Sequence, residues 1–246
     1  MGHYQITDLQ NQQEHLSATQ YDIRITNLAR FILRKIKKQG TFIDIGAGNG
    51  LVLRFFRDRG FKVAGMELSQ ELVDAMKKNP TMRGIELSQG NIVEENGKEN
   101  FDYVLASDVI EHIEDDRKAL KNLFSFVKPG GLLILTVPAH SHLFGKRDKA
   151  WGHHRRYDKK DLLDKLKVLD GTVEFATQWN LLGHFPYFFS EKILQKPINE
   201  TLRHSQSLVS RMVRKIIELE LRIEELFGFS PIGLTLVVGF RKAVRT

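Results

Sequence analysis

Three glycines at alternate positions place the strongest constraint on how this chain can fold. They end the segment Thr41-Phe42-Ile43-Asp44-Ile45-Gly46-Ala47-Gly48-Asn49-Gly50, which begins as an apolar run. An acidic residue, Glu67, follows downstream. An apolar strand that runs into a glycine-rich turn, with a carboxylate after it, is typical of a nucleotide-binding turn.

The spacing of the glycines distinguishes between nucleotide ligands. Dinucleotide binders need G-x-G-x-x-G, because the third glycine lets the following helix pack closely on the strand. Here Leu51 stands at the position of that glycine, and the third glycine comes one residue earlier at Gly50. Asp44 would also repel a pyrophosphate. The loop therefore favours a ligand with a positive sulfonium and an ammonium group over a dinucleotide.

The segment 42–50 resembles motif I of the class I S-adenosyl-L-methionine-dependent methyltransferases. Four further segments, 65–69, 90–92, 101–113 and 123–138, resemble the same family in the same order. The resemblance implies S-adenosyl-L-methionine as cofactor and S-adenosyl-L-homocysteine as product. The cofactor-binding residues it implies are Asp44, Gly46, Ala47, Gly48, Gly50, Glu67, Leu68, Asn91, Ile92, Ser107 and Asp108. Family members usually carry Asp at the position of Asn91, so here an amide oxygen would have to accept the hydrogen bond from the adenine amino group.

Apolar runs and amphipathic segments alternate along the chain, which predicts a parallel, doubly wound sheet. Strands are expected at 41–46, 61–66, 84–88, 101–106, 131–137, 172–177 and 234–240, and helices at 21–38, 49–58, 69–78, 114–127 and 159–169. The predicted fold class is α/β: a doubly wound, Rossmann-like, mostly parallel seven-stranded sheet with an N-terminal helix and a helical cap inserted before the last strand. Ligands of such sheets bind at the carboxyl ends of the strands.

The chain divides into four predicted segments. These are an N-terminal arm and helix (1–40), a cofactor-binding core (41–178), a helical cap (179–230) and the last strand of the core (231–246). The cap is expected because the resembling family usually joins its last two strands by a short hairpin, whereas here a long segment intervenes. Residues 199–227 show an apolar face at helical spacing and predict one or two helices.

The segment Asp148-Lys149-Ala150-Trp151-Gly152-His153-His154-Arg155-Arg156-Tyr157 follows the fifth predicted strand. It resembles the D-x-x-x-G-H-x-R-R-Y segment of a methyltransferase subgroup that often occurs with genes for glycan, lipid or quinone assembly. His153 can take a hydroxyl proton near neutral pH, and Arg155 or Arg156 can clamp a carboxylate or phosphate. Alternatively His153 makes a structural hydrogen bond, Arg156 and Asp148 form a structural ion pair, and Tyr157 packs. The candidate catalytic residues are Asp148, His153, Arg156 and His112.

Two residues, His112 and Arg24, each have two possible roles of equal weight. His112 either contacts the acceptor or orders its loop, and Arg24 either reaches the carboxylate of the cofactor or is solvated. His140, His142, Asp148, His153 and His154 also form a cluster of possible metal ligands. Their spacing matches no zinc pattern, so no metal is assigned.

Composition limits the class of protein. The 246 residues carry a formal net charge of +7 and a pI near 9.5, which allows an acidic partner. The absence of cysteine excludes disulfides, thiolate metal sites and cysteine nucleophiles. The N-terminus lacks the apolar core of a signal peptide, and no run is long enough for a membrane span. A cytoplasmic protein is expected, with peripheral membrane contact through 181–200 as an option.

The favoured function is methyl transfer from S-adenosyl-L-methionine to a small-molecule or lipid- or glycan-linked acceptor, at oxygen. A nucleic-acid methyltransferase is an alternative, but the sequence has no platform of interleaved basic and aromatic residues. A catalytically silent cofactor-binding module, with a cap that docks on a partner or a membrane, is another. The aromatic segment 179–189 suits an acceptor pocket, an interfacial patch or core packing. The oligomeric state stays open.

Overall fold

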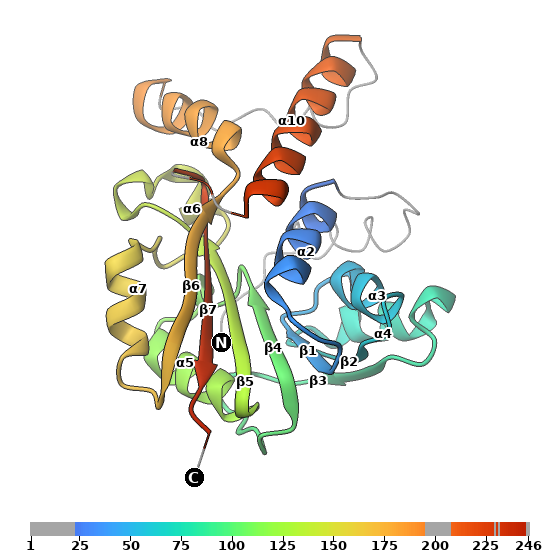
Figure 1. Ribbon diagram of the computed structural model, residues 1–246. Helices are drawn as coiled ribbons and strands as arrows, with labels where there is room; N and C mark the ends of the chain where they lie inside the picture. Colours follow the sequence, from blue (N-terminus) through green and yellow to red (C-terminus); the bar gives the residue numbers. More distant parts are fainter. Residues whose placement is uncertain (1–22, 195–207, 229, 231, 245–246) are drawn as a thin grey trace.

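Seven strands form one sheet in the order β3-β2-β1-β4-β5-β7-β6 (Figure 1). The computed structural model describes residues 23–194, 208–228, 230 and 232–244, so the predicted arm before residue 23 and residues 195–207 of the predicted cap lie outside the described residues. The strands are β1 (Thr41–Ile45), β2 (Lys62–Glu67), β3 (Glu86–Gln89), β4 (Phe101–Ser107), β5 (Val127–Pro138), β6 (Gly171–Trp179) and β7 (Thr235–Lys242). The predicted fold class is confirmed.

The sheet is parallel except at β7, which runs antiparallel to both β5 and β6. Strand β1 pairs with β2 on one side and with β4 on the other. The direction in which the chain winds therefore reverses between β1 and β4. In open α/β sheets such a reversal leaves a crevice beyond the carboxyl ends of the two strands, where ligands bind.

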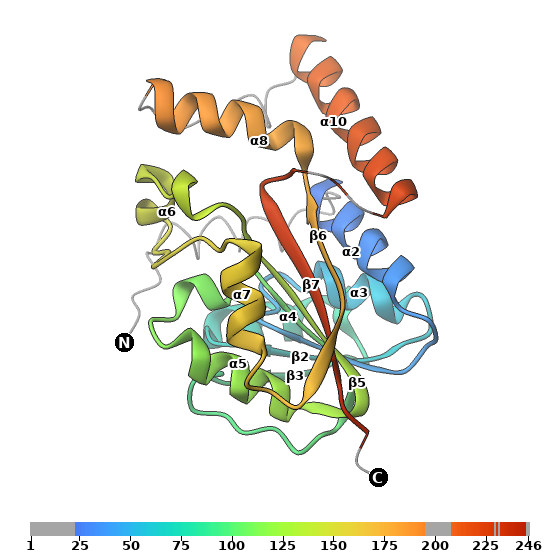
Figure 2. The same ribbon diagram turned by 60° about the vertical axis from the view of Figure 1, so that its left-hand side comes forward.

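Helices cover both faces of the sheet (Figures 1 and 2). One face carries α2 (Ile23–Lys35), α3 (Leu51–Arg57) and α4 (Gln70–Lys78), and the other carries α5 (Asp116–Ser125) and α7 (Lys159–Leu166). Buried aromatic rings hold the first face: Phe42 of β1 stacks on Phe56 of α3 with ring centroids 4.2 Å apart. Complete burial of one such side chain contributes about 1.5–3 kcal/mol.

Polar caps decide where two of these helices begin. The Ser69 hydroxyl accepts a hydrogen bond from the Leu72 amide and starts α4, and the Asp115 carboxylate accepts one from the Lys118 amide and starts α5. Each cap satisfies a backbone donor that the first helical turn leaves free. The helix predicted from 114 therefore begins at 116.

The segment between β6 and β7 contains α8 (Leu181–Phe188), a π-helical turn η4 (Phe189–Leu194) and α10 (Leu208–Phe227). Both helices stand beyond the carboxyl ends of the parallel strands (Figures 1 and 2). The Glu224 carboxylate of α10 accepts hydrogen bonds from the backbone amides of Asn180 and Leu181, at 2.7 and 2.9 Å. This contact joins α10 to the start of α8. No helix among the described residues is both long enough and apolar enough to cross a bilayer.

The structure differs from the sequence prediction around β5. The strand begins at Val127 rather than 131, because Gly130 adopts a φ of 76° and a register shift beside β4 absorbs the irregular turn. The connection from β5 to α7, for which no element is predicted, contains a 3-10 turn η3 (Ser141–Leu143) and a short helix α6 (Lys146–Ala150). Neither element is long enough to give a periodic pattern in the sequence.

Candidate active site

The glycine loop after β1 has a backbone path that only glycine follows without strain. Gly46, Gly48 and Gly50 have φ angles of 79°, 54° and 71°. The amides of Gly46 and Ala47 both donate to the Met66 carbonyl oxygen of β2, which fixes the loop to the neighbouring strand. A Cβ atom at Gly46 would lie 2.5 Å from a methyl of Val109, well inside contact distance. The loop is therefore held in one shape and tolerates no side chain at Gly46.

Two buried carboxylates face this loop. Glu67 accepts hydrogen bonds from the Gly48 amide at 2.8 Å and the Ser69 amide at 3.1 Å, so it ties the glycine loop to the end of β2. Asp44 is also buried, but its Oδ1 has no partner among the described residues. Burial, and then the charge of Glu67, raise the pKa of Asp44 to about 8. An unpartnered carboxylate at the carboxyl end of β1 fits a ligand that brings a positive charge.

The other predicted cofactor residues lie along the same edge of the sheet. The Asn91 side chain already accepts from the Val93 amide and donates to Glu94, both at 3.1 Å, so its carbonyl oxygen has one lone pair left for a ligand. Ile92 is buried and Leu68 is exposed. The Ser107 hydroxyl lies 2.8 Å from that of Thr136.

Asp108 takes the left-handed backbone conformation directly after β4, with a φ of 54°. Its carboxylate forms an ion pair of 3.4 Å with Arg24, which lies at the start of α2. The contact brings the N-terminal helix to the edge where the glycine loop lies. Arg24 thus has a carboxylate partner in this structure.

Asp148 is the centre of a buried hydrogen-bond network. It accepts from Arg156 Nε at 2.8 and 2.9 Å, from the Tyr187 hydroxyl at 2.8 Å, from the Gly145 amide at 2.9 Å and from His153 Nδ1 at 3.0 Å. Burial raises the pKa of Asp148, but the hydrogen bonds from His153 and Arg156 outweigh it and hold that pKa well below its usual range. The carboxylate is therefore ionised and firmly placed. The structural ion pair considered between Arg156 and Asp148 is formed.

The state of Asp148 determines the tautomer of His153. An ionised carboxylate only accepts hydrogen bonds, so His153 Nδ1 carries the ring proton. In the neutral ring, His153 Nε2 then has a lone pair. A histidine oriented in this way by a buried carboxylate has the arrangement of a general base.

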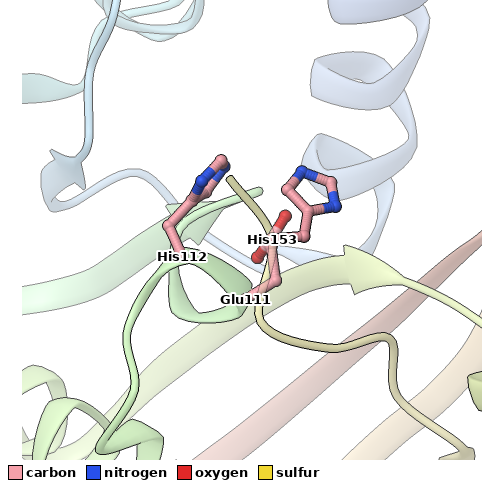
Figure 3. Close-up of side chains that lie close together, drawn as sticks. All are labelled: Glu111, His112 and His153. Carbon is pink, nitrogen blue, oxygen red and sulfur yellow. The ribbon is translucent and has the colours of Figure 1, made fainter. Parts of the chain in front are cut away.

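Glu111 and His112 of the 3-10 turn η2 (Ile110–His112) lie beside His153 (Figure 3). One ligand-type atom of each of the three residues lies within 4.8 Å of the others, and the imidazoles of His112 and His153 meet edge to face at 4.6 Å. Burial, followed by the nearby His153, lowers the pKa of His112 to about 4. Burial and the charge of Asp108 raise the pKa of Glu111 well above its usual value. Burial therefore favours the uncharged form of both side chains.

Arg155 and Tyr157 serve the packing of this loop. Arg155 forms a 2.9 Å ion pair with Asp116 and donates to the Glu114 carbonyl oxygen at 2.8 Å. Tyr157 is buried, and its hydroxyl donates to Asp116 at 2.9 Å. Since the carboxylates of Asp116 and Asp148 engage the guanidinium groups of Arg155 and Arg156, the geometry favours structural pairing over an anion clamp.

The five residues considered together as possible metal ligands do not form one cluster. His153 lies with Glu111 and His112, whereas His140 and His142 lie with Asp158. Asp148 is occupied by Arg156, and His154 is exposed. Sequence reasoning also missed Asp116 and Tyr187, which anchor the loop, and Glu111. The adjacency of Glu111 to His112 was the one available signal.

The fold and this edge of the sheet define the class I methyltransferase architecture. The family described as "Methyltransferase domain" matches residues 17–163, more than half of the chain. The chain belongs to this family. The resemblance seen in the glycine loop and the four later segments is thereby confirmed, and with it an enzyme family rather than a purely structural one.

Curated relatives match over a shorter stretch. The chain is 25% identical over 112 residues to the ubiquinone biosynthesis O-methyltransferase of Coxiella burnetii, covering 44% of this chain and 48% of that protein. It is 27% identical over 97 residues to the protein of the same name from Rickettsia canadensis, covering 39% and 41%. The chain thus spans about half the length of the curated relatives it matches.

Solved structures show the same fold at low identity. One is a complex between the Haloferax volcanii Trm112 methyltransferase activator and the putative methyltransferase, with a TM-score of 0.62 at 15% identity over 90% of each chain. Another is the Burkholderia thailandensis 1,6-didemethyltoxoflavin-N1-methyltransferase with bound S-adenosylhomocysteine, with a TM-score of 0.53 at 14% identity over 90% of this chain and 78% of that one. A third, the [4+2]-cyclase SpnF, has a TM-score of 0.58 at 20% identity over 91% and 81%. The fold alone therefore does not decide the reaction.

Proposed function

We propose that this chain is an S-adenosyl-L-methionine-dependent O-methyltransferase that acts on a small or lipid-linked hydroxyl compound. The family and the O-methyltransferase relatives support the reaction class. The observation that carries the proposal is the Asp148–His153 pair, which lies after β5 beside the end of β4. A hydroxyl acceptor needs a group that removes its proton, and this pair is built to do so.

The cofactor would lie over the glycine loop. Gly46, Ala47, Gly48 and Gly50 leave room for the methionine half, and the unpartnered Asp44 carboxylate suits its positive groups. Glu67 and Leu68 would face the ribose and adenine, Asn91 and Ile92 the adenine, and Ser107 with Asp108 the reacting end. When bound, S-adenosyl-L-methionine supplies a methyl carbon that its positive sulfur activates.

His153 would act as the general base. Its Nε2 accepts the proton of the acceptor hydroxyl as that oxygen becomes a nucleophile, and Asp148 stabilises the imidazolium that results. Arg156 and Tyr187 hold Asp148 in place and act as positioning residues. A base in this role contributes a factor of about 10²–10⁴ in rate.

Glu111 and His112 would form an uncharged wall around this base. Burial favours the uncharged form of both, because it raises the pKa of Glu111 and lowers that of His112. A water-poor surrounding strengthens the attraction between the Asp148 carboxylate and the imidazolium that forms at His153. His112 thereby contacts the base, and we propose that it also contacts the acceptor.

The aromatic side chains of α8 and η4 support a lipid-linked acceptor. Phe185, Phe188 and Phe189 are 58%, 41% and 51% exposed, and Ile193 continues the patch. These elements stand beyond the carboxyl edge of the sheet, on the side where the acceptor would enter (Figure 2). Aromatic residues favour the boundary between water and lipid. We propose peripheral membrane contact through residues 181–194; the last six residues of the predicted 181–200 patch lie outside the described part of the chain.

The silent cofactor-binding module is the second candidate, and the exposed apolar side chains of α10 favour it. Met212, Ile216 and Leu219 are exposed on that helix. Such a module would bind the cofactor and a partner without turnover. The nucleic-acid alternative has less support, because Arg155 and Arg156 already pair with Asp116 and Asp148 within the chain.

The proposal is tested by replacing His153 with alanine. The same replacement of its exposed neighbour His154 is the matched control. His153→Ala should lower kcat by about 10²–10⁴ while leaving the calorimetric affinity for S-adenosyl-L-methionine unchanged. His154→Ala should keep both. A wild-type rate in His153→Ala would remove the residue from the mechanism, and cofactor binding without turnover on any hydroxyl acceptor would favour the silent module.

A further inference from the structure

A second group of titratable side chains lies at the same end of the sheet, away from Asp148 and His153. His140 and His142 belong to the turn after β5, Asp158 precedes α7 and His184 belongs to α8. One ligand-type atom each of His140, His142 and Asp158 lies within 4.8 Å of the other two. The rings of His140 and His142 are 5.5 Å apart, and those of His140 and His184 are 4.9 Å apart.

Hydrogen bonds prepare these side chains to bind a cation. His140 Nε2 lies 3.0 Å from the Gly233 carbonyl oxygen, which can only accept, so Nε2 carries the proton and Nδ1 keeps a lone pair. A histidine that binds a metal through one ring nitrogen commonly donates its other N–H to a carbonyl oxygen in this way. Asp158 accepts hydrogen bonds from the Ser141 amide at 3.1 Å and from the Ser141 hydroxyl, which orient its carboxylate.

Two features of this corner stand out, the backbone of His140 and the ring of His184. His140 holds a left-handed backbone conformation, with a φ of 65°, although it is not glycine. Such a conformation costs on the order of 1–3 kcal/mol and is found where a site needs it. His184 is only 7% exposed, and its Nδ1 has no hydrogen-bond partner among the described residues. A buried ring nitrogen without a partner marks an incomplete polar site.

We propose that His140, His142 and Asp158 bind a divalent transition-metal ion of the zinc type, with a fourth position open to water. Two imidazoles and one carboxylate suit Zn²⁺, Ni²⁺ or Cu²⁺ better than Mg²⁺ or Ca²⁺, which prefer oxygen ligands. Metal–ligand bonds of about 2.0–2.1 Å in a tetrahedron place ligand atoms about 3.3 Å apart. The exposed side chain of His142 can rotate to close that difference, whereas His140 is held by Gly233 and Asp158 by Ser141.

The ion would fix the loop that carries the candidate base. His142 and Asp158 bracket residues 143–157, which include Asp148 and His153. A ligand that binds only the folded state raises its stability by mass action. Zinc should therefore raise Tm and hold this loop more firmly. The site itself does not depend on the proposed methyl transfer.

The test is a zinc titration of the full chain, stripped of metal and free of any affinity tag, in competition with a chromophoric chelator. We expect one equivalent of Zn²⁺ bound by wild type and an affinity at least about tenfold weaker in His142→Ala and in Asp158→Asn. His142 is exposed, so its replacement should leave the fold intact. His154→Ala, a change of an exposed histidine in the same loop, should bind like wild type. Replacing Zn²⁺ by Co²⁺ should give the intense visible band of a tetrahedral ion in wild type and His154→Ala, but not in His142→Ala or Asp158→Asn.

Three results would overturn the proposal. One is equal zinc affinity of wild type and His142→Ala. Another is a loss of zinc affinity in His112→Ala alone, which would locate the ion at Glu111, His112 and His153 instead. The third is a zinc-induced rise in Tm that His142→Ala retains.

Discussion

Replacing Asp148 with asparagine should damage both the fold and the candidate base. In the wild type the carboxylate is buried and accepts hydrogen bonds from Arg156, Tyr187, Gly145 and His153. Asparagine offers one acceptor oxygen in place of two, and it leaves the buried Arg156 guanidinium without a counter-charge. Loss of one partner of a buried ion pair costs about 3–5 kcal/mol. For a chain of this size, each kcal/mol shifts Tm by about 2–4 °C, so we expect a fall of about 6–20 °C.

The loss should depend on pH in a defined direction. The pKa of Asp148 is lower in the folded than in the unfolded chain. The contribution of Asp148 to the free energy of unfolding is therefore complete above the ordinary aspartate pKa of about 3.9. It disappears as the pH falls towards the lower pKa that Asp148 has in the folded chain. The Tm difference between wild type and Asp148→Asn should be full at pH 6–7 and shrink below about pH 4.

Thermal unfolding across this pH range, with an exposed aspartate as control, measures the effect. Asp164 forms an ion pair with Lys167 on the solvent side of α7, and Asp164→Asn should change Tm little. In the same samples, Asp148→Asn should lower kcat by about 10²–10⁴, since His153 loses the partner that sets its tautomer. A Tm within about 2 °C of wild type at pH 7 would refute the reasoning, because it would mean that the network contributes under about 1 kcal/mol.

Three further predictions concern the cofactor loop and the aromatic patch. Gly46→Val should abolish calorimetric binding of S-adenosyl-L-methionine, because a Cβ at this position meets Val109. Gly84 also has a positive φ but has open space around it, so the control Gly84→Ala should bind the cofactor normally. Binding of S-adenosyl-L-methionine should release a proton near pH 7, because the pKa of Asp44 is about 8 in the free protein and a bound cation lowers it. The affinity for S-adenosyl-L-methionine should therefore rise with pH, by at most about tenfold per pH unit up to about pH 8. Asp44→Asn should abolish this pH dependence. Joint replacement of Phe185, Phe188 and Phe189 by serine should reduce sedimentation with anionic liposomes, and the isolated exposed Val168→Ser should not; equal sedimentation would argue against membrane contact through this patch.

Much of the fold could be predicted because local signals agree with the tertiary structure. The strand and helix alternation and the glycine loop each act within a few residues, and each appears where the pattern indicated. The start of β5 could not be predicted, since it depends on a register shift against β4. The helices η3 and α6 escaped prediction because they are too short for a period.

The candidate site shows a similar division. The sequence indicated that Asp148, His153 and Arg156 belong together, because they share one short segment. It gave no sign that Tyr187, from the cap, completes the shell of Asp148. That contact is long-range and depends on how α8 lies over the loop. The separation of the histidines into two groups is likewise a product of tertiary packing, because His140 turns toward Gly233 and His153 toward Asp148.

Transfer of label from methyl-labelled S-adenosyl-L-methionine tests the central claim most directly. Wild type, His153→Ala and His154→Ala would each be incubated with a fractionated bacterial lysate, and label counted in the polar small-molecule, lipid, nucleic-acid and protein fractions. We predict label in the lipid or polar small-molecule fraction with wild type and His154→Ala, and a loss of about 10²–10⁴ in rate with His153→Ala. Label in the nucleic-acid or protein fraction, or an undiminished rate in His153→Ala, would contradict the account.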